Sequence, residues 1–222
     1  MKVGTDAVLL GAWTAVDTYS ESILDIGAGT GVISLMLAQR SEAMTIDAVE
    51  IDEKAHEQCV ENFELSAWGD RLFCYNAGFD EFVAEMVEEE EQYDLIVSNP
   101  PFYTDAYETE DDSRNKARFT TSLSFESLIV GASKILSNTG IFSVIIPYKE
   151  EKSFIKLAKK SKLHLNKVCN IKGNATADFK RSMLEFSFES SETKTEELII
   201  EISRHNYTSD YIELTKNFYL KM

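Results

Sequence analysis

The sequence of 222 residues predicts one α/β domain, built on a mostly parallel seven-stranded sheet with helices on both faces and an antiparallel C-terminal hairpin. Two observations lead to this prediction. Short apolar runs alternate with amphipathic segments along most of the chain, which is typical of parallel strands covered by helices. The last two apolar runs follow each other without a helix, which favours a hairpin at one edge of the sheet.

Seven apolar runs of strand length are the predicted strands. They are residues 23–27, 45–50, 71–75, 93–98, 141–146, 183–189 and 197–203. Helical spacing of apolar side chains predicts helices near residues 7–16, 31–40, 53–66, 80–91, 124–137 and 150–163. Thr5 or Asp6 is expected to cap the first of these helices, because either side-chain oxygen can accept from N–H groups of the first turn.

Composition excludes several classes of protein. Three cysteines without a C-x-x-C pair favour a reducing compartment over a disulfide framework. The three histidines are far apart and lack the spacing of metal ligands, so no metal is expected. No apolar run approaches the ~20 residues that span a bilayer, and no basic segment leads into an apolar one at the N-terminus. The sequence therefore predicts a cytoplasmic protein that does not associate with membranes.

The charge is distributed unevenly. The net charge of −16 argues by itself against a nucleic-acid partner. Residues 1–112 have a net charge of −22, however, whereas residues 113–222 have a net charge of +6. The segment 149–181 holds 10 Lys and Arg against 3 Asp and Glu, and the predicted helix 150–163 can present its lysines on one face. This face is interpreted either as a basic surface for a phosphate backbone or as an ordinary solvated helix.

The stretch LDIGAGTG has glycines at the point where the first strand ends and the next helix begins. Gly27, Gly29 and Gly31 permit a tight turn and a close approach of the backbone to a ligand, and the helix that follows begins with unpaired N–H groups. The second strand ends in Glu50, whose carboxylate can accept hydrogen bonds from a ribose diol. Together these features predict a nucleoside cofactor, although a glycine turn can also be purely structural.

Two cofactor classes compete for this loop. The dinucleotide fingerprint G-x-G-x-x-G requires a glycine at position 32, which is Val32. A loop with its third glycine at Gly31 fits S-adenosylmethionine better, since that donor has no pyrophosphate to cradle. Asp25 is expected either to meet the ammonium group of the donor or to pin the loop. Thr5 and the start of the first helix are expected to face the carboxylate of the donor.

The stretch SNPPF, residues 98–102, stiffens the backbone at the end of the fourth strand. In an open parallel sheet ligands bind beyond the carboxyl ends of the strands, so Asn99 is expected to lie next to the donor. The side-chain oxygen of Asn99 and the carbonyl of Pro100 can accept both N–H bonds of a planar amino group, and Phe102 can stack on its base. Pro100 and Pro101 hold these acceptors in place, because each fixes its own φ. The alternative is a rigid turn without chemistry.

These motifs resemble a known family. D-x-G-x-G-x-G followed by N-P-P-F is similar to class I, Rossmann-like methyltransferases that act on amino groups. The segments MKVGTDAVLLGAW, SNPPFY, ARFTTSLSFESL, KRSMLEFSF and YTSDYIELTKNFYL resemble the bacterial tRNA(Val) adenine-N6 methyltransferases, over nearly the whole chain. The resemblance implies tRNA as substrate and S-adenosylmethionine as donor. It implies target-base contacts at Asn99, Pro100, Pro101 and Phe102, and cofactor contacts at Thr5, Asp25, Gly27, Gly29, Gly31, Glu50, Ile51 and Phe79. The charge distribution adds Arg114, Arg118, Lys156, Lys159, Lys160 and Arg181 as expected RNA contacts.

The chain also departs from the family pattern. Gly78 stands where an Asp usually contacts the cofactor adenine, so that contact is expected near Phe79 or Asp80. Phe119 replaces a histidine, and the segment that usually precedes M-K-V-G-T-D is missing from this sequence. Three other readings stay open: a glutamine-N5 methyltransferase acting on a release factor or ribosomal protein, an rRNA amino-group methyltransferase, and a non-catalytic protein that keeps the fold.

Overall fold

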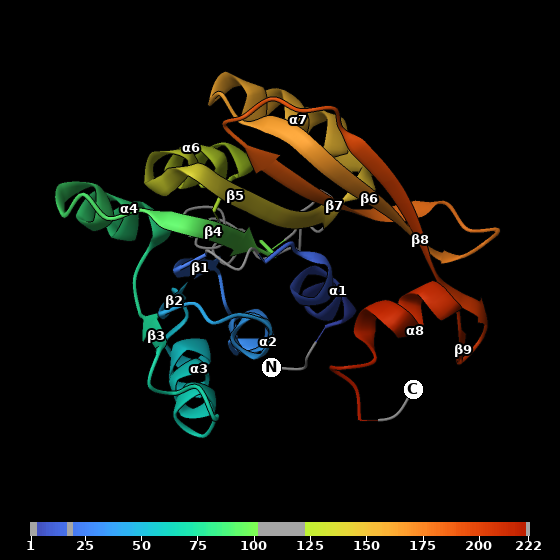
Figure 1. Ribbon diagram of the computed structural model, residues 1–222, viewed down its shortest axis with the longest axis horizontal. Coiled ribbons are helices and arrows are strands. Elements are labelled where there is room, and N and C mark those ends of the chain that lie inside the picture. Colours follow the sequence, from blue (N-terminus) through green and yellow to red (C-terminus); the bar gives the residue numbers. More distant parts are fainter. Residues whose placement is uncertain (1–3, 17–19, 102–122, 221–222) are drawn as a thin grey trace, which may run out of the picture.

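The computed structural model describes residues 4–16, 20–101 and 123–220. Every strand in these ranges belongs to one nine-stranded sheet with the order β3-β2-β1-β4-β5-β7-β6-β8-β9 (Figure 1). The strands are β1 (Ser22–Ile26), β2 (Thr45–Val49), β3 (Leu72–Tyr75), β4 (Tyr93–Ser98), β5 (Leu136–Pro147), β6 (His164–Asn174), β7 (Phe179–Ser187), β8 (Lys194–Ser203) and β9 (Asn206–Tyr207).

Helices cover both faces of the sheet, as predicted. They are α1 (Thr5–Trp13), α2 (Val32–Arg40), α3 (Glu53–Glu64), α4 (Phe79–Glu88), α6 (Phe125–Ile135), α7 (Glu151–Lys160) and α8 (Ser209–Thr215), with the short 3₁₀ helix η1 (Tyr148–Glu150) before α7. Figure 1 shows α4, α6 and α7 on one face, where their apolar side chains share one core cluster. The helices α1, α2, α3 and α8 pack a second cluster on the other face. In the described part of the chain, no helix has both the length and the apolar character needed to cross a bilayer.

The first five strands confirm the predicted parallel sheet. β1 pairs in parallel with β2 and β4, β2 with β3, and β4 with β5. Adjacent side chains of β1 show why the runs are apolar on both faces: Ile23 packs in one core cluster and Leu24 in the other. A strand buried on both sides reads as a continuous apolar run, which is the signal that predicted it.

The predicted pairing of the last two apolar runs is wrong, and the sheet has more than seven strands. β7 and β8 are separated by β6, which is antiparallel to β7 and parallel to β8. The antiparallel hairpin is therefore β6–β7. The sequence did not predict β6 because this strand is largely polar. Two of its lysines are neutralised by glutamates of the neighbouring strand β8: Lys167 Nζ lies 3.3 Å from Glu196, and Lys172 Nζ lies 2.8 Å from Glu197.

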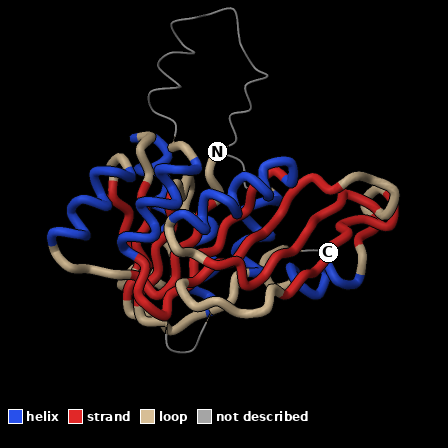
Figure 2. Tube along the Cα trace, turned by 90° about the horizontal axis from the view of Figure 1, so that it is seen from above, coloured by secondary structure: helices blue, strands red, loops and turns tan. Residues whose placement is uncertain are grey.

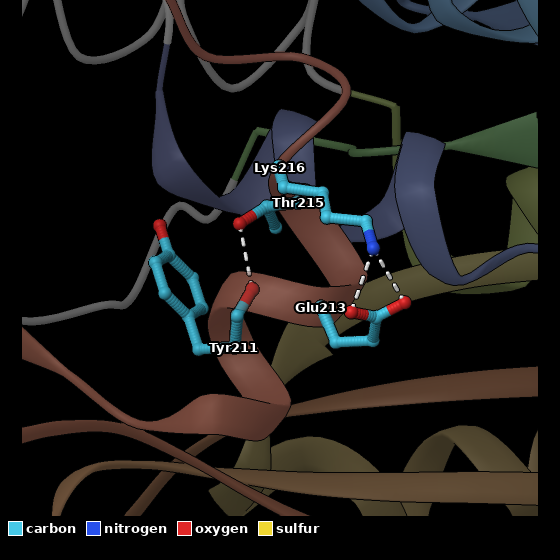
Figure 3. Close-up of polar contacts among 4 residues, drawn as sticks. All are labelled: Tyr211, Glu213, Thr215 and Lys216. Carbon is cyan, nitrogen blue, oxygen red and sulfur yellow. Dashed lines mark hydrogen bonds and ion pairs between the residues drawn. The ribbon is translucent and has the colours of Figure 1, made fainter. Parts of the chain in front are cut away.

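The C-terminal helix α8 was also not predicted from the sequence. Its N-cap Thr208 accepts a hydrogen bond from the N–H of Tyr211, and the Tyr211 ring is buried against the core. Figure 3 shows its internal contacts: the Thr215 hydroxyl donates to the carbonyl of Tyr211 at 2.7 Å, and Lys216 pairs with Glu213 at 2.7 Å. The charge of Lys216 is thus balanced within its own helix.

Candidate functional site

The carboxyl ends of β1, β2 and β4 bring three predicted site residues to one edge of the sheet. Ile26, the last residue of β1, lies opposite Val49 of β2 and Ser98 of β4. Gly27, Glu50 and Asn99 follow these residues directly, so the three leave the sheet at neighbouring positions. We call this border the carboxyl edge.

The glycine loop takes a conformation that other residues rarely adopt. Gly27, Gly29 and Gly31 have φ angles of 71°, 59° and 77°, all in the left-handed region. A Cβ on Gly31 would lie 2.4 Å from a ring carbon of Phe63, whereas a Cβ on Gly27 would meet no heavy atom within 4 Å. Gly31 is therefore required by packing, and the open space beside Gly27 is where a ligand can approach the backbone.

Glu50 clamps this loop to the end of β2. One carboxylate oxygen accepts the N–H of Gly29 at 2.8 Å, and the other accepts the N–H of Asp52 at 2.9 Å. The side chain of Asn76 donates to the backbone carbonyl of Glu50 at 2.9 Å. A largely buried carboxylate held in this way fits the donor predicted from the sequence, because its remaining lone pairs can accept from the hydroxyls of a ribose.

Asp25 is fully buried beneath the loop. Its Oδ2 accepts from the backbone N–H of Ser34 at 3.2 Å and from the Ser34 hydroxyl at 2.8 Å, so it fixes the first turn of α2. Its Oδ1 has no hydrogen-bond partner among the described residues. Burial, with a smaller contribution from the charge of Glu50, raises the pKa of Asp25 to about 6 against the lowering effect of the hydrogen bonds from Ser34. These contacts support the interpretation that Asp25 pins the loop.

The raised pKa of Asp25 predicts how stability depends on pH. An ordinary Asp has a pKa of about 3.9, so the native state binds the proton more tightly and the free energy of unfolding falls as pH rises from about 4 to about 6. The loss amounts to about 3 kcal/mol and is complete above this window. The variant Asp25→Asn cannot lose that proton. We expect its melting temperature, relative to the wild type, to rise between pH 4 and pH 6.5 and then to level off. A difference that does not change with pH would contradict a buried, ionised Asp25.

Ile51 and Phe79, where the contact with the cofactor adenine is expected, follow the end of β2 and begin α4. Ile51 is 57% exposed beside the carboxyl edge. A Cβ on Gly78, the N-cap of α4, would lie 4.0 Å from the Ile51 side chain. The Phe79 side chain is buried against Gly131 of α6, so Phe79 can offer a ligand only its backbone N–H, which has no acceptor within the first turn of α4.

The SNPP turn is anchored from below. The buried Ser98 hydroxyl donates to the carbonyl of Ile26 at 2.9 Å, which ties the end of β4 to the end of β1. Asn99 is half-buried, Pro100 is buried and Pro101 is exposed. Phe102 lies outside the described residues, as do Arg114 and Arg118. Because Ser98 pairs with Ile26, Asn99 and the carbonyl of Pro100 follow β4 next to the start of the glycine loop.

The predicted cap of the first helix is wrong. α1 begins at Thr5 itself, its N-cap is Gly4, and no side chain caps it. The Asp6 carboxylate instead accepts a hydrogen bond from Nε of Arg181 at 2.7 Å. This contact connects α1 with β7, at the position where Arg181 lies opposite Pro147, the last residue of β5. Arg181, predicted to contact RNA, is therefore at least partly engaged in an ion pair. Thr5 is exposed at the start of α1.

The predicted basic face lies on α7. Lys156, Lys159 and Lys160 are exposed, while Phe154 and Ala158 are buried. α7 begins just after β5 and runs back along the sheet. At 1.5 Å per residue, Lys159 and Lys160 in its last turn lie about 12–14 Å from its start at the carboxyl edge. The structure therefore separates these two lysines from Asn99 and Glu50.

Two residues that support the site were not predicted. Ser34 fixes Asp25, and Asn76 fixes Glu50. The signal for Asn76 is its place directly after β3, since a polar residue after a parallel strand lies at the carboxyl edge. In the described residues, no group of three or more His, Cys, Asp or Glu side chains is arranged to hold a metal ion.

Comparisons with known proteins show the family and the fold of the chain. The family model of the methyltransferase small domain matches residues 4–162. A protein of Christiangramia forsetii named tRNA1(Val) (adenine(37)-N6)-methyltransferase is 55% identical over 222 residues, which is all of this chain and 92% of that protein. A protein of Flavobacterium johnsoniae with the same name is 57% identical over 223 residues, covering all of this chain and 94% of the relative. Among solved structures, a predicted O-methyltransferase of Agrobacterium tumefaciens superposes with a TM-score of 0.72 at 22% identity, covering 96% of both chains.

Proposed function

The chain belongs to the methyltransferase small domain family and to the tRNA1(Val) (adenine(37)-N6)-methyltransferases, and we propose that it methylates the N6 amino group of an adenosine in tRNA. The donor is S-adenosylmethionine. The observation that supports this most directly is the meeting of the glycine loop, Glu50 and Asn99 at the carboxyl edge. The names of the relatives make adenosine 37 of tRNA(Val) the proposed position. We further propose that residues 1–222 act as one domain in the cytoplasm.

Positioning accounts for most of the proposed catalysis. The adenine amino nitrogen is a weak nucleophile because its lone pair is delocalised into the ring. The Asn99 side-chain oxygen and the Pro100 carbonyl accept its two N–H bonds and aim the nitrogen at the donor. When bound, S-adenosylmethionine supplies a methyl group on a sulfonium centre. The ion pair of Asp6 with Arg181 and the clamp of Gly29 by Glu50 hold the surrounding elements together.

The test is transfer of labelled methyl groups from S-adenosylmethionine into total RNA, separated afterwards into tRNA and rRNA, and, in parallel, into total protein. We expect label in tRNA, and N6-methyladenosine after digestion to nucleosides. Label in protein alone would replace the proposal with glutamine methylation, and label in rRNA alone would replace it with an rRNA activity. Absence of transfer to any of them would leave a non-catalytic protein.

The basic surface of α7 gives a separate prediction. The double variant Lys159→Ala and Lys160→Ala should bind tRNA more weakly. It should also flatten the slope of log affinity against log salt by about one to two units, since each phosphate contact contributes about −0.7 to −0.9. Filter binding across a salt series measures this slope. Lys216→Ala is the matched control, because Lys216 is already paired with Glu213. An unchanged slope in the double variant would place the last turn of α7 outside the RNA interface.

A further inference from the structure

Beyond the carboxyl edge, the β6–β7 hairpin and η1 form a second surface, which holds none of the residues proposed to contact the donor or the target base. β5 continues three residues past Val144, the partner of Ser98, to Pro147, which lies opposite Arg181. β6 continues further still, to Asn174. Figures 1 and 2 show this hairpin reaching beyond the rest of the sheet. The hairpin therefore projects on the side where a large substrate must approach Asn99.

Two aromatic rings meet on this projecting surface. Tyr148, the first residue of η1, and Phe179, the first residue of β7, have ring centroids 5.0 Å apart and an interplanar angle of 38°. Tyr148 is 37% exposed, and Phe179 is half-buried. Phe179 supports the Tyr148 ring from one side, so the exposed part of that ring is held in a fixed orientation.

Lysines surround this aromatic pair. Lys172 Nζ lies 4.3 Å from the centroid of the Phe179 ring and pairs with Glu197. Lys149 and Lys180, the chain neighbours of the two aromatic residues, are exposed. Lys149 Nζ lies 3.7 Å from the Glu150 carboxylate, in a loose ion pair that leaves 60% of the Lys149 side chain accessible. An exposed ring among cations is the combination that single-stranded nucleic acid binds, with bases on rings and phosphates on cations.

The same surface continues onto α7. Lys152 and Lys156 are exposed and four residues apart, so they lie on one side of the helix, and Lys149 precedes them in η1. The cations thus form a track that runs from the aromatic pair along α7. Exposed aromatic side chains also occur on β3, where Phe73 is 46% exposed, but they lie in the acidic half of the chain, which repels phosphates.

We propose that the Tyr148–Phe179 pair is a stacking platform for an unpaired base of the tRNA substrate, next to the base that enters the site at Asn99. Lys149 and Lys180 bind the flanking phosphates. This inference rests on the proposed function and assigns its substrate-binding surface. A target base must leave its stack to reach Asn99, and a platform that holds a neighbouring unpaired base offsets part of the cost of opening the loop.

Substitutions of Tyr148 test the platform. Tyr148→Leu keeps an apolar side chain against Phe179 but removes the ring, and Tyr148→Phe keeps the ring. A stacked base contributes about 1–3 kcal/mol, so Tyr148→Leu should weaken binding of an unmodified anticodon stem-loop and raise the KM for tRNA by about 5- to 150-fold. Tyr148→Phe should stay within about twofold of the wild type. The affinity for S-adenosylhomocysteine and kcat at saturating tRNA should change little in both variants. Phe73→Leu, a matched loss of an exposed ring on β3, should leave RNA binding unchanged.

The outcomes separate this inference from the proposed function. If the wild type methylates tRNA and Tyr148→Leu binds RNA as tightly as the wild type, the platform is wrong and the function stands. If the wild type transfers no methyl group to RNA, the proposed function itself fails. If Tyr148→Leu proves unstable, the double variant Lys149→Ala and Lys180→Ala replaces it. An unchanged salt dependence of RNA binding in that variant would equally overturn the platform.

Discussion

Replacement of Asn99 by alanine is expected to lower kcat by about two to three orders of magnitude while leaving the affinity for S-adenosylmethionine nearly unchanged. One preorganised polar contact at a reacting centre has an effect of this size when it is removed. Asn99 follows a strand that is tied to β1 through Ser98, so the backbone carbonyl of Pro100 should keep its place in the variant. Single-turnover methylation of unmodified tRNA, together with calorimetric titration of the donor, measures both quantities.

Two further variants sharpen this test. Asn99→Asp retains an acceptor oxygen and should keep more activity than Asn99→Ala. Asn217→Ala removes an exposed amide near the C-terminus and should keep wild-type turnover. Wild-type turnover in Asn99→Ala would mean that the SNPP turn is structural and that the amino group is oriented by other residues.

Those parts of the fold that depend on local signals could be predicted from the sequence. β4 is an uninterrupted apolar run that ends in a polar turn, and its boundaries, Tyr93–Ser98, coincide with the prediction. The glycines at 27, 29 and 31 all take the positive φ angles that only glycine adopts readily. The edge of the sheet at which Glu50 and Asn99 meet follows from parallel pairing, once the strands are known.

Contacts between distant segments could not be predicted. The order of β7 and β6 depends on cross-strand pairs such as Lys172 with Glu197, and a single strand sequence does not reveal its partners. The local sequence predicts Asp6 as a helix cap, because an Asp at the start of a helix can accept from the N–H groups of the first turn. Its partner Arg181 lies 175 residues away, and an ion pair with a hydrogen bond at 2.7 Å competes well with a cap in the first turn. The Tyr148–Phe179 pair was missed for the same reason.

The second large effect is expected at Glu50. Both of its carboxylate oxygens accept backbone N–H groups, from Gly29 and Asp52. In Glu50→Gln one of these N–H groups loses its acceptor, because it faces the amide NH₂ of the glutamine. The variant also has no charged acceptor for the hydroxyls of the ribose. Hydrogen bonds to a charged group contribute about 1.5–3 kcal/mol each, so we expect the affinity for S-adenosylmethionine to fall by about 100-fold or more. Glu53→Gln, which removes the same charge from the exposed first turn of α3, is the control and should bind the donor normally.

A modified ligand distinguishes a contact to the ribose from a clamp on the loop. If Glu50 accepts from the ribose diol, the wild type should bind a 2′-deoxy analogue of S-adenosylhomocysteine more weakly than the parent compound. Glu50→Gln should then discriminate less between the two ligands, because the partner of the missing hydroxyl is already altered. If Glu50 acts only through Gly29 and Asp52, the variant should lose affinity for both ligands by the same factor. Equal discrimination by wild type and variant, measured by calorimetry, would therefore limit Glu50 to shaping the loop and leave the ribose to other groups at the carboxyl edge.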